Sequence, residues 1–148
     1  SSAAIADGAA AVILTHAGRA AAMKMRPMAR ITGHASCARA PGEFTTAPIP
    51  AIQRLYETTG WADADVDLYE INEAFAAVVL AAMQDLNLDH AKVNVNGGAC
   101  ALGHPIGATG VRLVVTLIHA LRRRGLQRGI AALCIGGGEA TAIALELV

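Results

Sequence analysis

The sequence lacks an excess of either charge, since 12 Lys and Arg residues balance 12 Asp and Glu residues in a chain of 148. The basic residues form no extended stripe, which argues against nucleic acid as a main partner. The only basic run, residues 122–124, closes a helical pattern just before Gly125. Cations at that position complement the carbonyl end of a helix dipole, so we expect a helix end rather than a phosphate site.

Cysteine is also scarce. Cys37, Cys100 and Cys134 are far apart and lie in apolar sequence, which favours reduced thiols over a disulfide framework. We therefore expect a reducing compartment and a cytoplasmic location. Cys100 lies four residues before His104, but no CxxC or HxxxH motif is nearby to complete the usual four ligands of zinc, so the sequence predicts no metal site.

Long apolar runs and nucleotide-binding loops are absent as well. No stretch approaches the roughly 20 uncharged residues of a membrane-spanning helix, and no charged-then-apolar leader opens the chain. We therefore expect a soluble protein with no membrane contact. The glycine-rich segments match neither GxGxxG nor GxxxxGK[ST], so they do not indicate a nucleotide site. The chain starts at Ser1 without Met and enters an ordered-looking motif at once, which leads us to expect part of a longer polypeptide.

The residues that are present alternate between strand-like and helical patterns. Hydrophobic residues make up 54% of the chain, enough for one domain with a real core. We predict strands at residues 9–14, 29–38, 66–71, 93–95, 129–135 and 140–148. We predict helices at residues 16–25, 51–59, 74–86 and 106–121, with a proline-rich loop at 38–50 long enough to suspect binding. The helix at 74–86 is apolar nearly all round and should be buried.

This alternation predicts an α/β layered domain with a mixed, mostly parallel sheet and helices on both faces. The continuous apolar run at 129–135 is typical of a strand covered on both sides. Ligands of open sheets bind at the carboxyl ends of the strands. Asn72 and Cys134 end two predicted strands, and His104 follows a third, so we expect these side chains to converge.

His104 lies in the segment NVNGGACALGHPIGATG, residues 94–110. Its place between Gly103 and Pro105 predicts the first turn of a helix, whose positive end disfavours a protonated imidazole. A neutral imidazole can accept a proton from a thiol. The residues alone fit a structural, helix-capping histidine better than a catalytic one.

Cys134 ends a buried strand and precedes three glycines, which can direct successive N–H groups at one point and stabilise an anion, including its own thiolate. An inert core cysteine is the alternative. Asn72 is expected to cap the helix that follows it, and Glu73 to be a favourable partner of the dipole of that helix.

Four segments, in order and with matching spacing, resemble the signature blocks of the carboxyl-terminal half of the thiolases. They are IADGAAAV (5–12), NEAFA (72–76), residues 94–110 and CIGGGEATA (134–142). The resemblance covers essentially residues 1–148 as one carboxyl-terminal thiolase domain. The loop FTTAPIPAI (44–52) and the sequence GGACALGHPIG resemble those of bacterial acetyl-CoA acetyltransferases more than those of long-chain degradative thiolases.

The resemblance implies the Claisen condensation of two acetyl-CoA molecules to acetoacetyl-CoA, and the reverse thiolysis, by a ping-pong mechanism. Such chemistry needs a nucleophile, a base and donors for two oxyanions. In thiolases the nucleophilic cysteine belongs to the amino-terminal half. The resemblance makes His104 the acceptor of its proton and a donor to the thioester oxygen. It makes Cys134 the base for the α-proton, Gly136 an oxyanion donor through its N–H, and Asn72 the holder of a water that joins His104.

The resemblance also implies the ligands. Acetyl-CoA, acetoacetyl-CoA and CoA would be substrates and products, with no further cofactor, and Ile5, Phe44 and Phe75 would contribute to binding them. Ala3 stands where many thiolases carry serine, which removes a polar contact near the pantetheine, whereas Thr109 keeps the hydroxyl of the more frequent serine. The expected partners are the amino-terminal half and further copies, as a homodimer or homotetramer.

Two other functions stay open at this point. The chain could be a thiolase-like module without catalysis, for assembly or for binding CoA esters. It could also belong to a degradative 3-ketoacyl-CoA thiolase of broader chain length.

Overall fold

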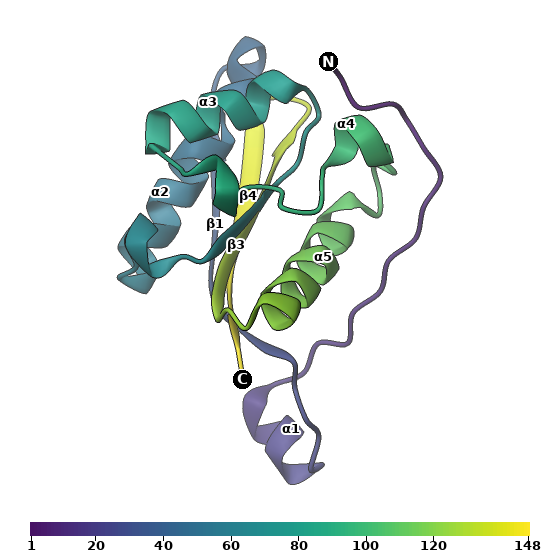
Figure 1. The fold of residues 1–148 in the computed structure, drawn as a ribbon, viewed down its shortest axis with the longest axis vertical. Helices are drawn as coiled ribbons and strands as arrows, with labels where there is room; N and C mark the ends of the chain where they lie inside the picture. The colour runs from purple at the N-terminus through teal and green to yellow at the C-terminus, as the bar shows by residue number, and fades with distance from the viewer.

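The computed structural model describes all residues, 1–148, and arranges them around one four-stranded sheet (Figure 1). The strands are β1 (Ala29–Ala38), β2 (Leu68–Ile71), β3 (Arg128–Ile135) and β4 (Glu139–Leu147). The helices are α1 (Ala17–Ala22), α2 (Pro48–Thr59), α3 (Ala76–Leu86), α4 (Ala99–Leu102) and α5 (Thr109–Arg124). Short 3-10 helices span Pro41–Thr46, Asp63–Asp65 and His90–Lys92. The predicted α/β class is confirmed.

The strand order is β1-β4-β3-β2, and the sheet is mixed, as predicted. The prediction that it is mostly parallel is wrong for this chain. Only β2 and β3 are parallel, whereas β4 pairs antiparallel with both β3 and β1. The reason is the turn at residues 136–138, where Gly137 (φ 119°) and Gly138 (φ 103°) adopt backbone conformations open to glycine and reverse the chain into a hairpin.

Helices cover both faces of the sheet, as predicted (Figure 1). On one face, α2 and α3 pack with β1, β3 and β4 around the larger core, which includes Ile52, Leu55 and Ile71. On the other face, α5 packs with β2 and β3 through Leu113, Leu117 and neighbouring side chains. The strand β3 is therefore covered on both sides, in agreement with its continuous apolar run. None of these helices is long and apolar enough to cross a bilayer.

The first sixteen residues form an extended strap that runs along the outside of the molecule to α1 (Figure 1). The predicted strand at 9–14 is wrong, because these residues pair with no strand. Ile13 and Leu14 are 86% and 73% exposed. A β-branched, apolar run makes a strand only where a neighbouring strand can accept its backbone hydrogen bonds.

Other local predictions need smaller corrections. Residues 93–95 form no strand, since Val93 makes only an isolated bridge to Tyr69. The helix α3 is not buried all round, because Leu80 is 62% exposed. The loop predicted at 38–50 ends early, since α2 begins at Pro48.

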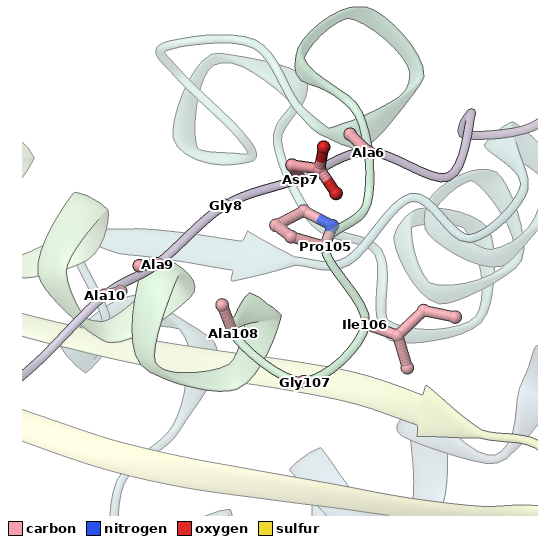
Figure 2. Close-up of a pocket in the computed structure, with 9 residues that line it drawn as sticks. All are labelled: Ala6, Asp7, Gly8, Ala9, Ala10, Pro105, Ile106, Gly107 and Ala108. Atoms are coloured by element: carbon pink, nitrogen blue, oxygen red, sulfur yellow. The ribbon is translucent and has the colours of Figure 1, made fainter.

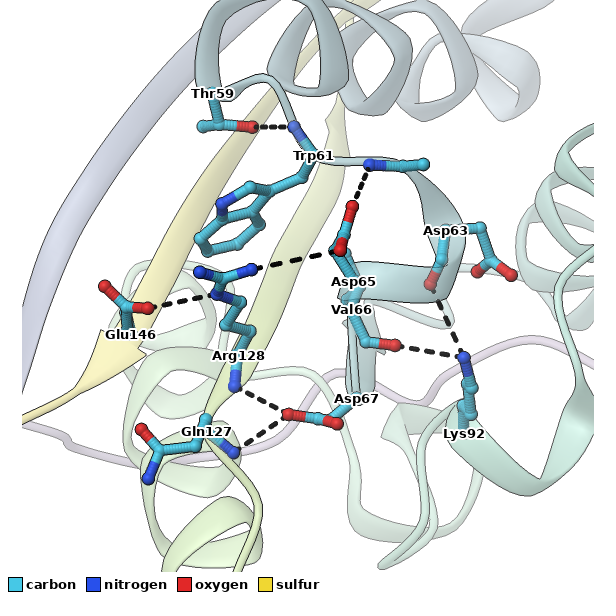
Figure 3. A network of polar contacts seen from close by, with 11 residues as sticks. Thr59, Trp61, Asp63, Asp65, Val66, Asp67, Lys92, Gln127, Arg128 and Glu146 are labelled. Carbon is cyan, nitrogen blue, oxygen red and sulfur yellow. Dashed lines mark hydrogen bonds and ion pairs between the residues drawn. The ribbon is translucent and has the colours of Figure 1, made fainter.

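A polar network fixes the amino-terminal end of β3, at the opposite end of that strand from Cys134 (Figure 3). Asp67 Oδ2 accepts hydrogen bonds from the N–H groups of Gln127 (2.9 Å) and Arg128 (2.8 Å). The Arg128 guanidinium lies 5.0 Å from the centre of the Trp61 ring, and its Nε donates to Glu146 Oε1 at 3.0 Å. This network aligns β3 between β2 and β4.

Replacing Asp67 with alanine should lower the free energy of unfolding by about 1–3 kcal/mol, because two N–H groups lose their acceptor. Thermal unfolding of the complete protein would measure the loss, and Asp67→Asn, which keeps one acceptor oxygen, should recover part of it. An Asp67→Ala protein as stable as the wild type would contradict this role.

Candidate active site

Asn72 directly follows β2 and extends its hydrogen-bond ladder, since its N–H donates to the Ala132 carbonyl at 2.9 Å. The residue is 1% exposed, and both polar atoms of its amide lack a hydrogen-bond partner. Asn72 is not the cap of α3, as the sequence predicted, because Phe75 takes the cap position and no side chain caps the helix. The amide is therefore free to bind something other than its own backbone.

Asn94 holds the end of β2 in place, a role that the sequence did not reveal. Its Oδ1 accepts from the Ile71 N–H at 2.8 Å and its Nδ2 donates to the Ile71 carbonyl at 2.9 Å. The side chain thus replaces the neighbouring strand that the edge of the sheet lacks. Asn94 has φ 47°, a left-handed conformation that asparagine tolerates better than most residues. An Asn in a glycine-rich turn was the only signal available.

The Glu73 side chain hydrogen-bonds to α4 rather than to α3. The first turn of α3 has no acidic residue, so the predicted dipole partner is wrong. The Glu73 carboxylate instead accepts from the Cys100 N–H at 2.9 Å and from Asn94 Nδ2 at 3.2 Å. A Cβ on Gly98 would collide with this carboxylate, which explains the glycine. No group of three or more His, Cys, Asp or Glu side chains is placed to hold a metal ion.

His104 lies in a loop between α4 and α5 and not in the first turn of a helix, since α5 begins five residues later. Its N–H donates to the Ala4 carbonyl at 2.8 Å. Gly103 before it has φ 89°, and a Cβ there would lie 2.6 Å from Ala6 Cβ. Close packing of the strap, rather than a helix dipole, places this histidine.

The side chain of His104 is oriented by Thr109, the first residue of α5. The distance from His104 Nδ1 to Thr109 Oγ1 is 2.6 Å, and Thr109 Oγ1 donates to the Pro105 carbonyl at 3.0 Å. A hydroxyl has a single proton, so both bonds form together only if Nδ1 carries the ring proton. In that tautomer, Nε2 has a free lone pair and can accept a proton.

Cys134 is the last but one residue of β3 and is 9% exposed. Burial raises the pKa of its thiol above the ordinary value, although a backbone hydrogen bond opposes the shift. The predicted stabilisation of the resting thiolate by the glycine turn is therefore wrong, and the thiol is the stable form at neutral pH. A thiolate formed there from time to time is a correspondingly stronger base.

The glycine turn leaves two N–H groups available, those of Gly136 and Gly137. Gly138 N–H donates to the Ile135 carbonyl at 3.3 Å and closes the turn. The exposed Gly136 donates to no acceptor within the chain. Its N–H lies two residues after Cys134 and is free to bind an anionic oxygen.

The fold brings Asn72 and Cys134 to the same end of the sheet, where β2 and β3 finish, because these strands are parallel neighbours with Ile71 opposite Ala132. The strap connects the loop of His104 to this end of the sheet. Ala3 N–H donates to the Ala74 carbonyl at 3.1 Å, and the next residue of the strap, Ala4, accepts from His104.

The three residues predicted to bind CoA esters lie beside these loops. Phe44 and Phe75 form an edge-to-face pair with ring centres 6.0 Å apart and planes at 65°. Ile5 pairs through its backbone with His104, and its side chain is 86% exposed. The three lie in different elements, and their role in binding stays a prediction.

A shallow depression of about 430 Å³ lies where the strap crosses the loop after His104 (Figure 2). Gly8 approaches the Pro105 ring so closely that a Cβ would lie 2.8 Å from Pro105 Cγ. The depression contains neither Asn72 nor Cys134, so it is not the site that the sequence predicts.

Glu70, two residues before Asn72 in β2, is a buried acid that the sequence did not single out. Its side chain is 1% exposed, and its Oε2 lies 3.4 Å from Arg112 NH1 in α5. Burial raises the pKa of Glu70 to about 7, and Arg112 only partly offsets that effect.

The raised pKa of Glu70 makes folding stability depend on pH. Between pH 4.5 and about 7 the unfolded chain releases this proton while the folded chain retains it, so stability should fall as pH rises through this range. The loss is on the order of 3 kcal/mol for a shift of this size. The melting temperature of the complete protein should fall more steeply from pH 5 to pH 8 than that of Glu70→Gln. Parallel curves for the two proteins would refute the shift.

The chain is similar to known proteins over most of its length. Residues 25–147 match the carboxyl-terminal domain of thiolase. Over 95% of the chain, identity is 52% to a probable acetyl-CoA acetyltransferase of Dictyostelium discoideum and 49% to the acetyl-CoA acetyltransferase of Escherichia coli. The chain spans about a third of these relatives, 34% and 36% of their lengths.

Solved structures show the same fold. The acetyl-CoA acetyltransferase of Bacillus anthracis matches 89% of the chain with a TM-score of 0.87 and 48% identity. Human mitochondrial 3-ketoacyl-CoA thiolase in complex with CoA matches 89% with a TM-score of 0.87 and 40% identity. The chain covers 34% of each of these structures. The higher identity to the acetyl-CoA acetyltransferases confirms the resemblance predicted from the loop at 44–52 and the glycine-rich block.

Proposed function

The chain belongs to the thiolase family, as its carboxyl-terminal domain, and on that premise we propose that it is the proton-transferring part of an acetyl-CoA acetyltransferase. The complete protein would condense two acetyl-CoA molecules to acetoacetyl-CoA and catalyse the reverse thiolysis. The observation that carries the proposal is the hydrogen-bond chain from His104 through Thr109 to Pro105, which leaves Nε2 of His104 ready to accept a proton.

In the first half-reaction, a cysteine outside this chain attacks the acetyl carbonyl carbon of acetyl-CoA. Nε2 of His104 accepts the proton of that cysteine, and the tetrahedral intermediate then loses the sulfur of CoA. The departing CoA thiolate takes a proton from solvent, so that an acetylated cysteine, CoA and a His104 ring protonated at Nε2 remain. The Gly136 N–H would stabilise the oxyanion on the acetylated cysteine.

In the second half-reaction, the thiolate of Cys134 removes an α-proton from a second acetyl-CoA. The resulting carbanion attacks the acetylated cysteine, a C–C bond forms, and the cysteine leaves as a thiolate that regains its proton from Nε2 of His104. Cys134 then releases the α-proton to solvent, which restores the starting state. The burial of Cys134 supports this role, because a thiolate with a raised pKa is a stronger base towards a carbon acid. The same raised pKa keeps the thiol protonated for thiolysis, in which it returns the proton to carbon.

The enolate of the second acetyl-CoA needs its own oxyanion hole. We assign it to the N–H that Nε2 of His104 gains in the first half-reaction and to a water held by Asn72. The buried, unpaired amide of Asn72 supports this assignment. The proposed substrates are acetyl-CoA, acetoacetyl-CoA and CoA, with no additional cofactor. The proposed partners are an amino-terminal thiolase half and further copies in a homodimer or homotetramer. A cytoplasmic location is also proposed, and the cytosolic acetyl-CoA acetyltransferase of Mus musculus, 49% identical, supports it.

The test compares the complete protein with the isolated 148-residue chain, each supplied with acetyl-CoA. We expect acetoacetyl-CoA and an acetylated protein from the former and neither product from the latter, which lacks the nucleophile. Robust turnover by the isolated chain would refute the proposal that the nucleophilic cysteine lies outside it. Thiolysis of acetoacetyl-CoA should exceed that of longer 3-ketoacyl-CoA esters, and the reverse preference would favour the degradative alternative.

A further inference from the structure

Three buried side-chain atoms in the chain have no hydrogen-bond partner, and they belong to two residues of one strand end. They are Glu70 Oε1, Asn72 Oδ1 and Asn72 Nδ2. Each of the two residues is 1% exposed. Because buried polar groups in proteins are nearly always hydrogen-bonded, their occurrence together indicates a shared partner.

The spacing of the two residues suits a shared partner. Side chains two residues apart along a strand point to the same face, with backbones about 6.6 Å apart. The Glu70 carboxyl faces α5, where its Oε2 meets Arg112. Asn72 continues the ladder of β2 with Ala132, so the same spacing applies to it. A single water bridges polar atoms up to about 5.5 Å apart, so side chains with this backbone spacing can share one water if they lean toward each other.

The neighbouring side chains are already engaged. Both polar atoms of the Asn94 amide bond to the backbone of Ile71. The carboxylate of Glu73 bonds to Cys100 N–H and to Asn94. Arg112 reaches Glu70 Oε2 and leaves Oε1 unpaired. A water is therefore the group best able to satisfy Glu70 Oε1 and Asn72 together.

We propose that Glu70 is a positioning residue for Asn72, through one buried water that bonds to Glu70 Oε1 and to one amide atom of Asn72. The water fixes the rotation of the amide. The other amide atom then faces the edge of the sheet, where it can hold the water of the oxyanion hole. The effect on catalysis rests on the proposed function, whereas the buried water does not.

A double-mutant cycle in the complete protein tests the positioning role. Glu70→Leu should lower the rate of condensation about tenfold, the order expected for one hydrogen bond. Glu70→Gln, which keeps a polar group at this place, should recover the rate to within about threefold. In the Asn72→Ala background, Glu70→Leu should have no further effect, because the residue that it positions is gone. Equal losses in both backgrounds would overturn the role.

Leu68→Ala is the matched control, since Leu68 lies two residues earlier in β2 and packs in the same cluster as α5. It should lower the melting temperature and leave the rate of condensation close to that of the wild type. A loss as large as that of Glu70→Leu would show that packing between β2 and α5, rather than the water, carries the effect, and would overturn the proposal.

Crystal structures of the complete wild-type protein and of Glu70→Gln provide a readout that is independent of activity. Electron density for a water within hydrogen-bond distance of Glu70 Oε1 and the Asn72 amide is expected. A well-defined wild-type site without that water would overturn the inference even in an active enzyme. An inactive wild-type protein that contains the water would refute the proposed function and leave the water site standing.

Discussion

Replacing His104 with alanine in the complete protein should slow acetylation of the nucleophilic cysteine by about 10²–10⁴-fold, the usual contribution of a proton-transfer group. The physical reason is the loss of Nε2, the lone pair that the bond to Thr109 leaves free. A single-turnover measurement with radiolabelled acetyl-CoA would give the acetylation rate directly. An unchanged rate would remove His104 from the first half-reaction.

The orientation of His104 can be tested separately from its presence. Thr109→Val removes the hydroxyl from a fully buried position and keeps nearly the same shape. We expect a smaller loss, about 10-fold, because the imidazole remains but loses one hydrogen bond. Thr109→Ser retains the hydroxyl and should stay close to the wild type. If Thr109→Val and Thr109→Ser behaved alike, the hydrogen bond to Nδ1 would not orient the ring.

Replacing Cys134 with alanine should abolish the exchange of α-protons in acetyl-CoA while acetylation of the nucleophile proceeds. The expected loss of exchange is about 10²–10⁴-fold. The two half-reactions separate because Cys134 ends β3, whereas His104 is held by the strap and by α5. Incorporation of deuterium from solvent into acetyl-CoA, followed by NMR, would measure the exchange.

Cys37→Ala is the control for this experiment. Cys37 lies in β1 and pairs with Ala140, the same β4 residue that pairs with Cys134 on the other side. Loss of its thiol should leave both acetylation and exchange at wild-type rates. Exchange that persisted in Cys134→Ala would assign the α-proton to another base.

The regular elements of the sheet were largely predictable from the sequence. The strand β1 spans the predicted residues, and α2 ends at Gly60, whose φ of 72° gives the left-handed end that glycine favours. The apolar run of β3 and the three glycines after it predicted a buried strand and a return strand beside it. These patterns depend on near neighbours in the chain, so local physics is sufficient to predict them.

Other predictions failed where distant segments decide the structure. The run at 9–14 has the composition of a strand but has no strand to pair with in the chain. His104 was placed at the first turn of a helix because it lies between Gly103 and Pro105, yet contacts with Ala4 and Ala6 of the strap hold it in a loop. The Glu73 carboxylate accepts a hydrogen bond from α4 instead of from the helix that follows it in sequence.

The sequence by itself determined the family, because the segments that hold His104, Cys134 and Asn72 have the order and spacing of a thiolase carboxyl-terminal domain. It also determined the α/β class, since hydrophobic periodicity is a local property. Only the tertiary structure decided the state of each group. The tautomer of His104 depends on Thr109 and Pro105. The protonated state of Cys134 depends on its burial. The Asn72 amide is unpaired because Asn94 and Glu73 bond to each other and to the backbone instead. Burial and hydrogen-bond partners come from segments far apart in the chain, so no local pattern specifies them.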